Sequence, residues 1–204
     1  MTGKLISLEG IDGCGKGTQI NLLRNHLTTQ QIPHHIFREP GGTDISERIR
    51  SLLLHETEYM DSGTELLLFL AARRQLTTEK ILPLLEQNEL VILDRFYDST
   101  FAYQGFGRGT DIKNITALND FAITEKQTDA TFYLHVSLEA SYQRTMHQEK
   151  DRMEKESRKF FERVKNGYDT LAKMHPQRIH VIDAEREPQE IHKDLVSRVE
   201  ALYT

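Results

Sequence analysis

The segment that decides the fold reads Gly10-Ile11-Asp12-Gly13-Cys14-Gly15-Lys16-Gly17-Thr18. An apolar β-type run, Leu5 to Glu9, comes directly before it, and helical spacing begins at Lys16 and continues to Gln30. A strand, a glycine-rich loop with a lysine, and a helix in this order are typical of a P-loop. We therefore predict that residues 10–18 bind the phosphates of a nucleotide.

The residue types of this loop suit that task. Glycines let successive backbone N–H groups turn inward without a clash of Cβ atoms, and the following helix adds the positive end of its dipole. Lys16 is then expected at the β- and γ-phosphates. Cys14 is better explained as a small packing residue than as a nucleophile, because backbone amides face the phosphate. Glu9 is expected to accept hydrogen bonds from amides at the strand ends.

One position departs from the common P-loop pattern. Most P-loops place Ser or Thr after the lysine to bind Mg²⁺, but here Gly17 follows it and the hydroxyl comes one residue later, at Thr18. We expect Mg²⁺ to be held mainly by water, ATP phosphates and a carboxylate. Asp94, at the end of a later β-type run, is the first candidate. Asp12 is the second, although it could instead face the acceptor sugar.

β-type runs alternate with longer helical segments along the chain, and this order predicts βαβ units and a parallel sheet. The expected strands cover residues 5–9, 35–38, 91–94, 131–136 and 179–182. The expected helices cover residues 16–30, 44–55, 65–86, 112–126, 138–147, 154–174 and 188–202. Pro83 lies inside the third helical segment and predicts a kink or an early end there.

Composition limits the class of protein. The chain has 204 residues, 38% hydrophobic residues and a net charge of −5, which predict a single globular domain over residues 1–204 that binds neither nucleic acid nor membranes. The single cysteine excludes an internal disulfide. With no apolar leader, a cytoplasmic location is expected.

Two further segments follow β-type runs. Arg38-Glu39-Pro40-Gly41-Gly42-Thr43 comes after the second run, and residues 94–105, which begin Asp94-Arg95-Phe96-Tyr97-Asp98-Ser99-Thr100, come after the third. Ligands of parallel α/β sheets gather at the carboxyl ends of strands, where these segments lie. Together with the P-loop, they resemble the thymidylate kinases of bacteria.

The resemblance implies a nucleoside monophosphate kinase fold, with a five-stranded parallel sheet flanked by helices, a flexible lid at about residues 148–156, and a homodimer. It also implies transfer of the γ-phosphoryl group of ATP to dTMP in dTTP biosynthesis, with Mg²⁺ as cofactor. The acceptor phosphate is already ionised near neutral pH, so no general base is needed.

Several acceptor-side roles are carried over from the resemblance. Arg38 and Arg95 are expected to grip the dTMP phosphate, and guanidinium groups suit this because they bind phosphate with two parallel hydrogen bonds. Phe69 and Arg73 share a helix face, where the ring would stack on thymine and the arginine would reach a base oxygen. The remaining acceptor positions are Ser99, Thr100, Tyr103 and Gln104. Tyr103 is either a steric wall against a ribose 2′-hydroxyl or a packed residue with a satisfied hydroxyl.

The resemblance also assigns residues on the ATP side. Arg152 of the charged segment would act as an arginine finger on the γ-phosphoryl group, because the loop carries Gly13 where other family members carry an arginine. The contribution of Lys150 stays open. Arg144, Asp183 and Ala184 would border the adenine.

Two other functions are also compatible with a P-loop. A different nucleotide kinase is compatible with Gly-Lys-Gly-Thr, but the segments at residues 38–43 and 102–105 argue against it. A GTPase-type switch would carry a guanine-specifying Asn-Lys-x-Asp motif, which the sequence lacks.

Overall fold

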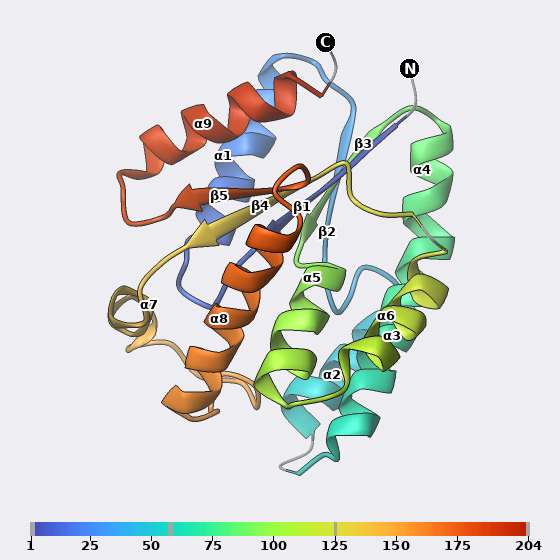
Figure 1. Ribbon diagram of the computed structural model, residues 1–204. Helices are drawn as coiled ribbons and strands as arrows, with labels where there is room; N and C mark the ends of the chain where they lie inside the picture. The colour runs from blue at the N-terminus through green and yellow to red at the C-terminus, as the bar shows by residue number, and fades with distance from the viewer. Residues whose placement is uncertain (1–2, 57–58, 125, 203–204) are drawn as a thin grey trace.

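The computed structural model describes residues 3–56, 59–124 and 126–202. Its centre is a five-stranded sheet in the order β2-β3-β1-β4-β5, in which every neighbouring pair is parallel (Figure 1). The strands are β1 (Lys4–Glu9), β2 (His34–Arg38), β3 (Leu90–Asp94), β4 (Ala130–His135) and β5 (Ile179–Asp183). The predicted parallel sheet and its five strands are confirmed, with ends that differ by one residue.

Helices surround this sheet. They are α1 (Lys16–Thr29), α2 (Asp44–Ser51), α3 (Ser62–Leu76), α4 (Leu82–Glu86), α5 (Tyr97–Thr100), α6 (Ile112–Ile123), α7 (Leu138–Thr145), α8 (Arg158–Met174) and α9 (Pro188–Glu200). Wider π-helical turns extend α2 over Leu52–Glu56, join α3 to α4 over Thr77–Ile81, and continue α5 over Phe101–Gly107. In Figure 1, α1 and α9 pack together on one face of the sheet, while α5 and α8 lie on the other.

The central strands are buried because their side chains pack into apolar clusters on both faces of the sheet. On β1, Ile6 and Leu8 belong to one apolar cluster, whereas Leu5 lies in a second cluster with Val91 and Leu93 of β3. Alternate residues of a strand point to opposite faces, and both faces of a parallel sheet are covered by helices. This burial fixes the strand register and thus the positions of the loops that follow β1, β2 and β3.

Two helical predictions need correction. The helix expected from residue 154 begins at Arg158, because the hydroxyl of Ser157 accepts a hydrogen bond from the Phe160 amide and forms the N-cap. Residues 152–155 form turns instead. A helix over residues 97–107 was not predicted, since its glycines and its Asp-Ser-Thr run favour other structures. Packing against α8 stabilises it, and a Cβ at Gly107 would lie 2.7 Å from the Phe160 ring.

Pro83 does not end its helix early, because α4 continues past it to Glu86, where the predicted segment also ends. The helix widens into π-helical turns before this proline and stops at Glu86. A proline cannot donate to the preceding turn, so the regular ladder is interrupted there.

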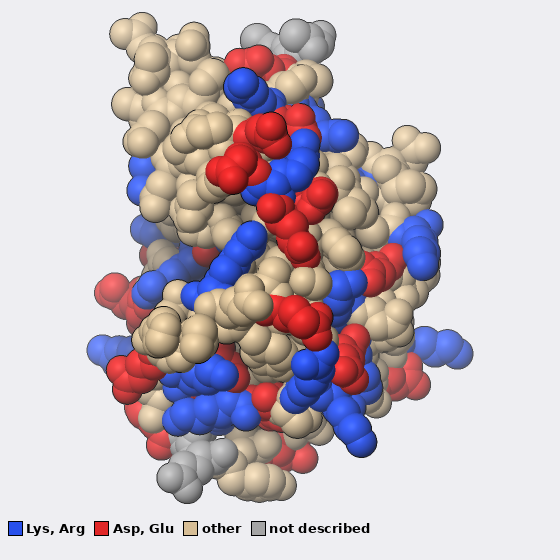
Figure 2. All heavy atoms as spheres, turned by 90° about the vertical axis from the view of Figure 1, so that its left-hand side faces the viewer, with Lys and Arg blue, Asp and Glu red and all other residues tan. Residues whose placement is uncertain are grey.

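The surface shows mixed charge. Figure 2 shows Lys and Arg side chains interspersed with Asp and Glu side chains over the face that carries α7 and α9. This pattern differs from the contiguous basic surface by which proteins usually bind long polyanions. Among the described residues, no helix is both long enough and apolar enough to cross a bilayer.

Candidate active site

The loop after β1 has the conformation that its glycines allow. Gly10, Gly13 and Gly15 have φ values of 139°, 75° and 95°, and Gly15 precedes the first turn of α1. Such positive φ angles are favoured by glycine because a Cβ would clash with the backbone. The loop therefore turns back toward the start of α1, and Gly13, Gly15 and Lys16 line the adjoining cleft. The N-terminus of a helix at such a place favours a phosphate.

Lys16 lies over this loop in the first turn of α1. Its Nζ atom donates to the carbonyl oxygens of Gly10 at 3.1 Å and Ile11 at 3.4 Å, and the side chain is buried. Cys14 is buried beside it, with its sulfur 3.7 Å from that Nζ atom. The packing role expected for Cys14 agrees with this burial.

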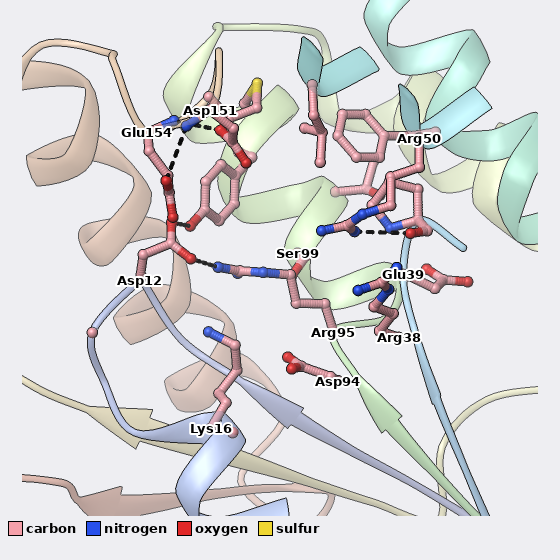
Figure 3. Close-up of a pocket in the computed structure, with 18 of the residues that line it drawn as sticks. Asp12, Lys16, Arg38, Glu39, Arg50, Asp94, Arg95, Ser99, Asp151 and Glu154 are labelled. Atoms are coloured by element: carbon pink, nitrogen blue, oxygen red, sulfur yellow. Dashed lines mark hydrogen bonds and ion pairs between the residues drawn. The ribbon is translucent and has the colours of Figure 1, made fainter. Parts of the chain in front are cut away.

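A cleft of about 380 Å³ opens beside the loop and joins all three predicted motifs. Its lining includes the predicted residues Asp12, Gly13, Gly15, Lys16, Gly17, Thr18, Arg38, Phe69, Arg73, Asp94, Arg95, Ser99, Thr100, Tyr103 and Gln104. Residues separated by up to 92 positions in the sequence therefore share one cavity, as the strand-end argument predicts. Figure 3 shows Arg95 between Asp12 on the loop side and Arg38, Glu39 and Arg50 on the opposite side.

Arg95 is fixed between the two halves of the cleft. Its Nη1 atom donates to the Gly10 carbonyl at 2.8 Å, and its Nη2 atom pairs with Asp12 at 2.5 Å. The guanidinium also lies 5.0 Å from the centre of the Tyr103 ring. Burial alone would raise the pKa of Asp12, but the charges of Arg95 and Lys16 lower it. Asp12 is therefore ionised and holds the arginine in place.

Arg38 and Arg50 supply two further cations on the acceptor side. Arg38 pairs with Glu47 at 3.2 Å and its side chain is 58% exposed, so it is free to exchange this partner for a phosphate. Arg50 of α2 donates to the Pro40 carbonyl at 2.9 Å and lines the cleft. Sequence analysis missed Arg50. The available signal was its place in the helical segment that directly follows the motif at residues 38–43.

Phe69 and Arg73 of α3 both line the cleft, and Arg73 is also bound to several groups of the protein. Each N–H group of its guanidinium already has an acceptor within the protein. These are Glu39, Thr100, Asn119 and the Phe96 carbonyl. In this arrangement Arg73 has no donor left for a base oxygen, and its contact with the base stays a prediction.

Arg73 supports two residues of the cleft. It bonds Thr100 at 2.6 Å and pairs with Glu39 at 2.6 Å. Burial raises the pKa of Glu39, against the charge of Arg73. The second carboxylate oxygen of Glu39, Oε1, is buried without a hydrogen-bond partner among the described residues.

Glu9 organises the far wall of the cleft. Its carboxylate is fully buried and accepts hydrogen bonds from the Phe96 amide at 2.7 Å, the Ser99 hydroxyl at 2.6 Å and the Tyr168 hydroxyl at 3.1 Å. Glu9 accepts an amide at the end of a strand, as expected, and it also ties α8 to the loop after β3. Burial, reinforced by the charge of Asp98, raises the pKa of Glu9 to about 7.

The comparisons with known proteins agree with this geometry. The family model described as thymidylate kinase matches residues 8–195. A thymidylate kinase of Thermoanaerobacter sp. (strain X514) is 42% identical over 98% of this chain and 98% of its own length. Another, of Fervidobacterium nodosum, is 45% identical over 94% of this chain and 95% of its own length.

This chain belongs to the thymidylate kinase family.

A solved structure is also similar. The crystal structure of thymidylate kinase from Ehrlichia chaffeensis has a TM-score of 0.79 and 36% sequence identity, and the match covers 98% of this chain and 99% of that one. The predicted P-loop kinase fold is thereby confirmed for this member of the thymidylate kinase family.

The lid segment does not place Arg152 in the cleft. Asp151, Met153 and Glu154 line the cleft, but Arg152 does not. Its Nε atom donates to the Leu53 carbonyl at 2.7 Å, and its Nη1 atom pairs with Glu65 at 2.7 Å. In this structure a buried carboxylate thus holds the Arg152 guanidinium outside the cleft. Contact between Arg152 and the γ-phosphoryl group stays a prediction.

The packing around Gly13 explains why the loop carries no arginine at this position. A Cβ at this position would lie 2.7 Å from the Ser141 carbonyl of α7, and the φ angle of 75° favours glycine. The Ser141 hydroxyl also donates to the Asp12 carbonyl at 2.7 Å. Helix α7 therefore packs too closely on the loop to leave room for a side chain at Gly13.

The residues assigned to the adenine side lie together. Arg144 of α7 donates to the Gly13 carbonyl at 3.2 Å and to the Ala184 carbonyl at 3.1 Å. Asp183 ends β5 beside Ala184 and accepts a hydrogen bond from the Glu185 amide at 3.0 Å. The structure thus brings Arg144, Asp183 and Ala184 to the back of the P-loop, although contact with adenine stays a prediction.

The described residues contain no preformed cluster of three or more metal-binding side chains. Asp94 nevertheless lines the cleft together with Thr18, and its carboxylate makes no hydrogen bond to the part of the chain that the structure describes. Asp12 is already paired with Arg95. Oxygen ligands suit Mg²⁺, which usually keeps several waters. Asp94 therefore fits a Mg²⁺ ion carried on nucleotide phosphates better than Asp12 does.

The pKa of Glu9 leads to a pH dependence of stability. The ordinary value of 4.5 applies to the unfolded chain, and the folded value is about 7. Between these values the unfolded chain binds fewer protons than the folded one, so this group lowers stability as pH rises, and the effect levels off above pH 7. In Glu9→Gln this contribution is absent. We expect the difference in unfolding free energy, wild type minus variant, to fall by on the order of 3 kcal/mol across this range.

Urea unfolding at several pH values would measure this difference. Any hydrogen bond that the substitution weakens adds a constant offset, so only the slope carries the prediction. Parallel pH profiles for the two proteins would contradict the raised pKa.

Proposed function

We propose that this chain transfers the γ-phosphoryl group of ATP to dTMP, giving dTDP and ADP for dTTP synthesis. One observation carries the proposal. A single cleft joins a P-loop with Lys16 to an acceptor side that carries Arg38, Arg95 and the Phe69 ring. Donor and acceptor phosphates can therefore meet in line between the cations.

The reaction needs charge neutralisation more than proton transfer. An oxygen of the acceptor phosphate forms a bond to the γ-phosphorus, while the bond between this phosphorus and the β–γ bridging oxygen breaks and ADP leaves. Lys16 faces the donor phosphates, and Arg95 lies between donor and acceptor. Fixed cations of this kind stabilise the charge that spreads over the transferred group. When bound, Mg²⁺ would neutralise phosphate charge, and Asp94 would hold it directly or through water.

The acceptor side favours a thymine deoxynucleotide. Phe69 presents a ring at the cleft wall and is half-buried, as a stacking platform requires. Tyr103 is buried, and its hydroxyl lies 3.4 Å from an Asp12 carboxylate oxygen. This contact satisfies the hydroxyl and supports a fixed wall beside the sugar. Gln104 and Thr100 complete the same wall.

We also propose that the chain forms a homodimer through α2, α3 and α6. Ile45, Leu67 and Phe121 are exposed on these helices, by 52%, 58% and 71%, and α3 packs against both α2 and α6. Arg74 of α3 lies 5.1 Å from the Phe121 ring and links two of the helices. Exposed apolar side chains on packed helices are typical of an interface.

The first test of the proposed activity compares acceptors. ADP release is measured with Mg²⁺, ATP and either dTMP, dUMP, AMP or no acceptor, and we expect it to be fastest with dTMP. Lys16→Ala and Arg95→Ala should each lower kcat by at least about 100-fold, since one well-placed donor contributes roughly 3 kcal/mol. Circular dichroism would show that each variant is folded. A near-normal kcat with dTMP in either variant would remove that residue from the mechanism.

Phe69→Ala tests recognition of the base. Loss of stacking should raise the KM for dTMP with little change in the KM for ATP, at a cost of about 1–3 kcal/mol. Phe106→Ala is the matched control, because Phe106 packs against Gly167 of α8 and does not line the cleft. The control should melt earlier but keep its KM for dTMP. If Phe69→Ala behaves like the control, Phe69 is only a packing residue.

The dimer is tested by analytical ultracentrifugation. We expect the wild type to sediment as a dimer and Phe121→Glu as a monomer, because a buried unpaired carboxylate opposes association. Met174→Glu is the control, since Met174 is 64% exposed at the end of α8, away from these helices. Equal effects of both substitutions, or a monomeric wild type, would rule out this interface.

A further inference from the structure

Glu65 is a buried carboxylate outside the cleft that has no role in the phosphoryl transfer described above. It lies in the first turn of α3 and is 0% exposed. Its oxygens accept from Gln104 at 2.9 Å, from Arg108 at 3.1 and 3.0 Å, and pair with Arg152 at 2.7 Å. Burial alone would raise the pKa of Glu65, but the hydrogen bonds from Arg108 and Gln104 lower it. The carboxylate is therefore ionised.

The carboxylate of Glu156 adds a second negative charge near Glu65, Arg108 and Arg152. Glu156 pairs with Arg108 at 2.5 Å, and the Arg108 guanidinium lies 4.8 Å from the centre of the Phe160 ring. We call Glu65, Arg108, Arg152 and Glu156 the Glu65 cluster. Its two carboxylates balance its two guanidinium groups, so each charge has a partner in a poorly solvated place.

The Glu65 cluster joins the lid to the acceptor side of the cleft. Through α3, Glu65 belongs to the helix that presents Phe69, and it also fixes the amide of Gln104. Arg152 is further held by the backbone after α2, because its amide donates to the Leu54 carbonyl at 3.1 Å and its Nε atom to the Leu53 carbonyl. Glu65 and Arg152 are thus each attached to a segment that forms a wall of the cleft.

The lid residues beside Arg152 depend on this attachment. Met153 is buried in the main core, and Asp151 and Glu154 form a turn in which each side chain accepts from the other's amide. These three residues line the cleft. If the Arg152 guanidinium moved into the cleft, Glu65 would lose a charged partner and the Leu53 carbonyl would lose its donor. Breaking such a buried pair is costly.

We propose that Glu65 is a positioning residue that holds the lid docked against the acceptor side, and that Arg152 acts as the lid's anchor. The proposal rests on the proposed function only for its kinetic consequences. The docked lid excludes water from the cleft, so loss of the anchor raises ATP hydrolysis relative to transfer. Loss of the Glu65–Gln104 contact weakens the acceptor side and raises the KM for dTMP.

The first measurement does not depend on the reaction. Hydrogen–deuterium exchange, read by mass spectrometry, follows the Arg152 amide in peptides that cover residues 148–156. We expect Glu65→Gln and Arg152→Met to exchange there about 10-fold faster than wild type, the size expected when one member of a network is removed. Asp98→Asn is the matched control, because Asp98 is also buried and pairs with Arg178 at 2.6 Å, but in contacts that include no lid residue. The control should leave lid exchange unchanged.

The kinetic measurement separates an anchor from an arginine finger. As an anchor, Arg152→Met should resemble Glu65→Gln in kcat, in the KM for dTMP and in the ratio of ATP hydrolysis to transfer. The double variant should be little worse than either single variant, and Arg152→Lys should restore part of the loss. As a finger, Arg152→Met would lower kcat by about 10³-fold or more while Glu65→Gln stayed near wild type.

The outcomes are distinguishable. Unchanged lid exchange in Glu65→Gln, or the finger pattern of rates, would overturn the proposal. If the wild type failed to phosphorylate dTMP, the proposed function would fall, while lid exchange would still decide whether Glu65 anchors the lid.

Discussion

The rest of the active cleft depends on the hydrogen bonds that the buried Glu9 carboxylate accepts. Glu9 ends the central strand, and it binds the Phe96 amide after β3 and the Tyr168 hydroxyl of α8. Arg95 directly precedes Phe96 and has a φ angle of 68°, which few residues other than glycine adopt. A buried acceptor at the end of β1 thus secures a strained backbone position. This backbone in turn directs a guanidinium between the P-loop and the acceptor side.

Some cations of the cleft have strong partners within the protein, and others have weaker ones. Arg95 is held by Asp12 and a backbone carbonyl, and Arg73 is satisfied by its protein partners, so neither moves far. Lys16 and Arg38 have weaker partners, namely loop carbonyls and an exposed carboxylate. Fixed groups provide preorganisation, whereas weakly held groups can turn toward phosphates at small cost. An acidic chain can bind two polyanions in this way because a few cations, Lys16, Arg38 and Arg95 among them, line the cleft where the phosphates would lie.

Sequence patterns predicted the sheet, the P-loop and the set of residues that meet in the cleft. The sheet follows from local periodicity, and the P-loop and the segments after β2 and β3 follow from the rule that strand ends share one edge. The acceptor-side residues on helices, such as Phe69, were found only through the resemblance to the family. The partners of individual arginines could not be predicted in the same way. Arg152 faces Glu65 and Arg73 faces Glu39, and each carboxylate belongs to a distant part of the chain. Local spacing gives the position of a guanidinium, but tertiary packing decides which buried carboxylate binds it. The helix over residues 97–107 was missed for the same reason.

The close contact between Gly13 and α7 limits which side chains the phosphate loop can carry. Any Cβ at Gly13 would lie 2.7 Å from the Ser141 carbonyl, so an arginine could enter the loop at this position only if α7 moved away. The cations of the cleft therefore come from outside this position, from Lys16 at the start of α1 and from Arg38, Arg50 and Arg95 on other elements. A helix that packs against the back of the loop thus determines which elements can supply positive charge to the phosphates.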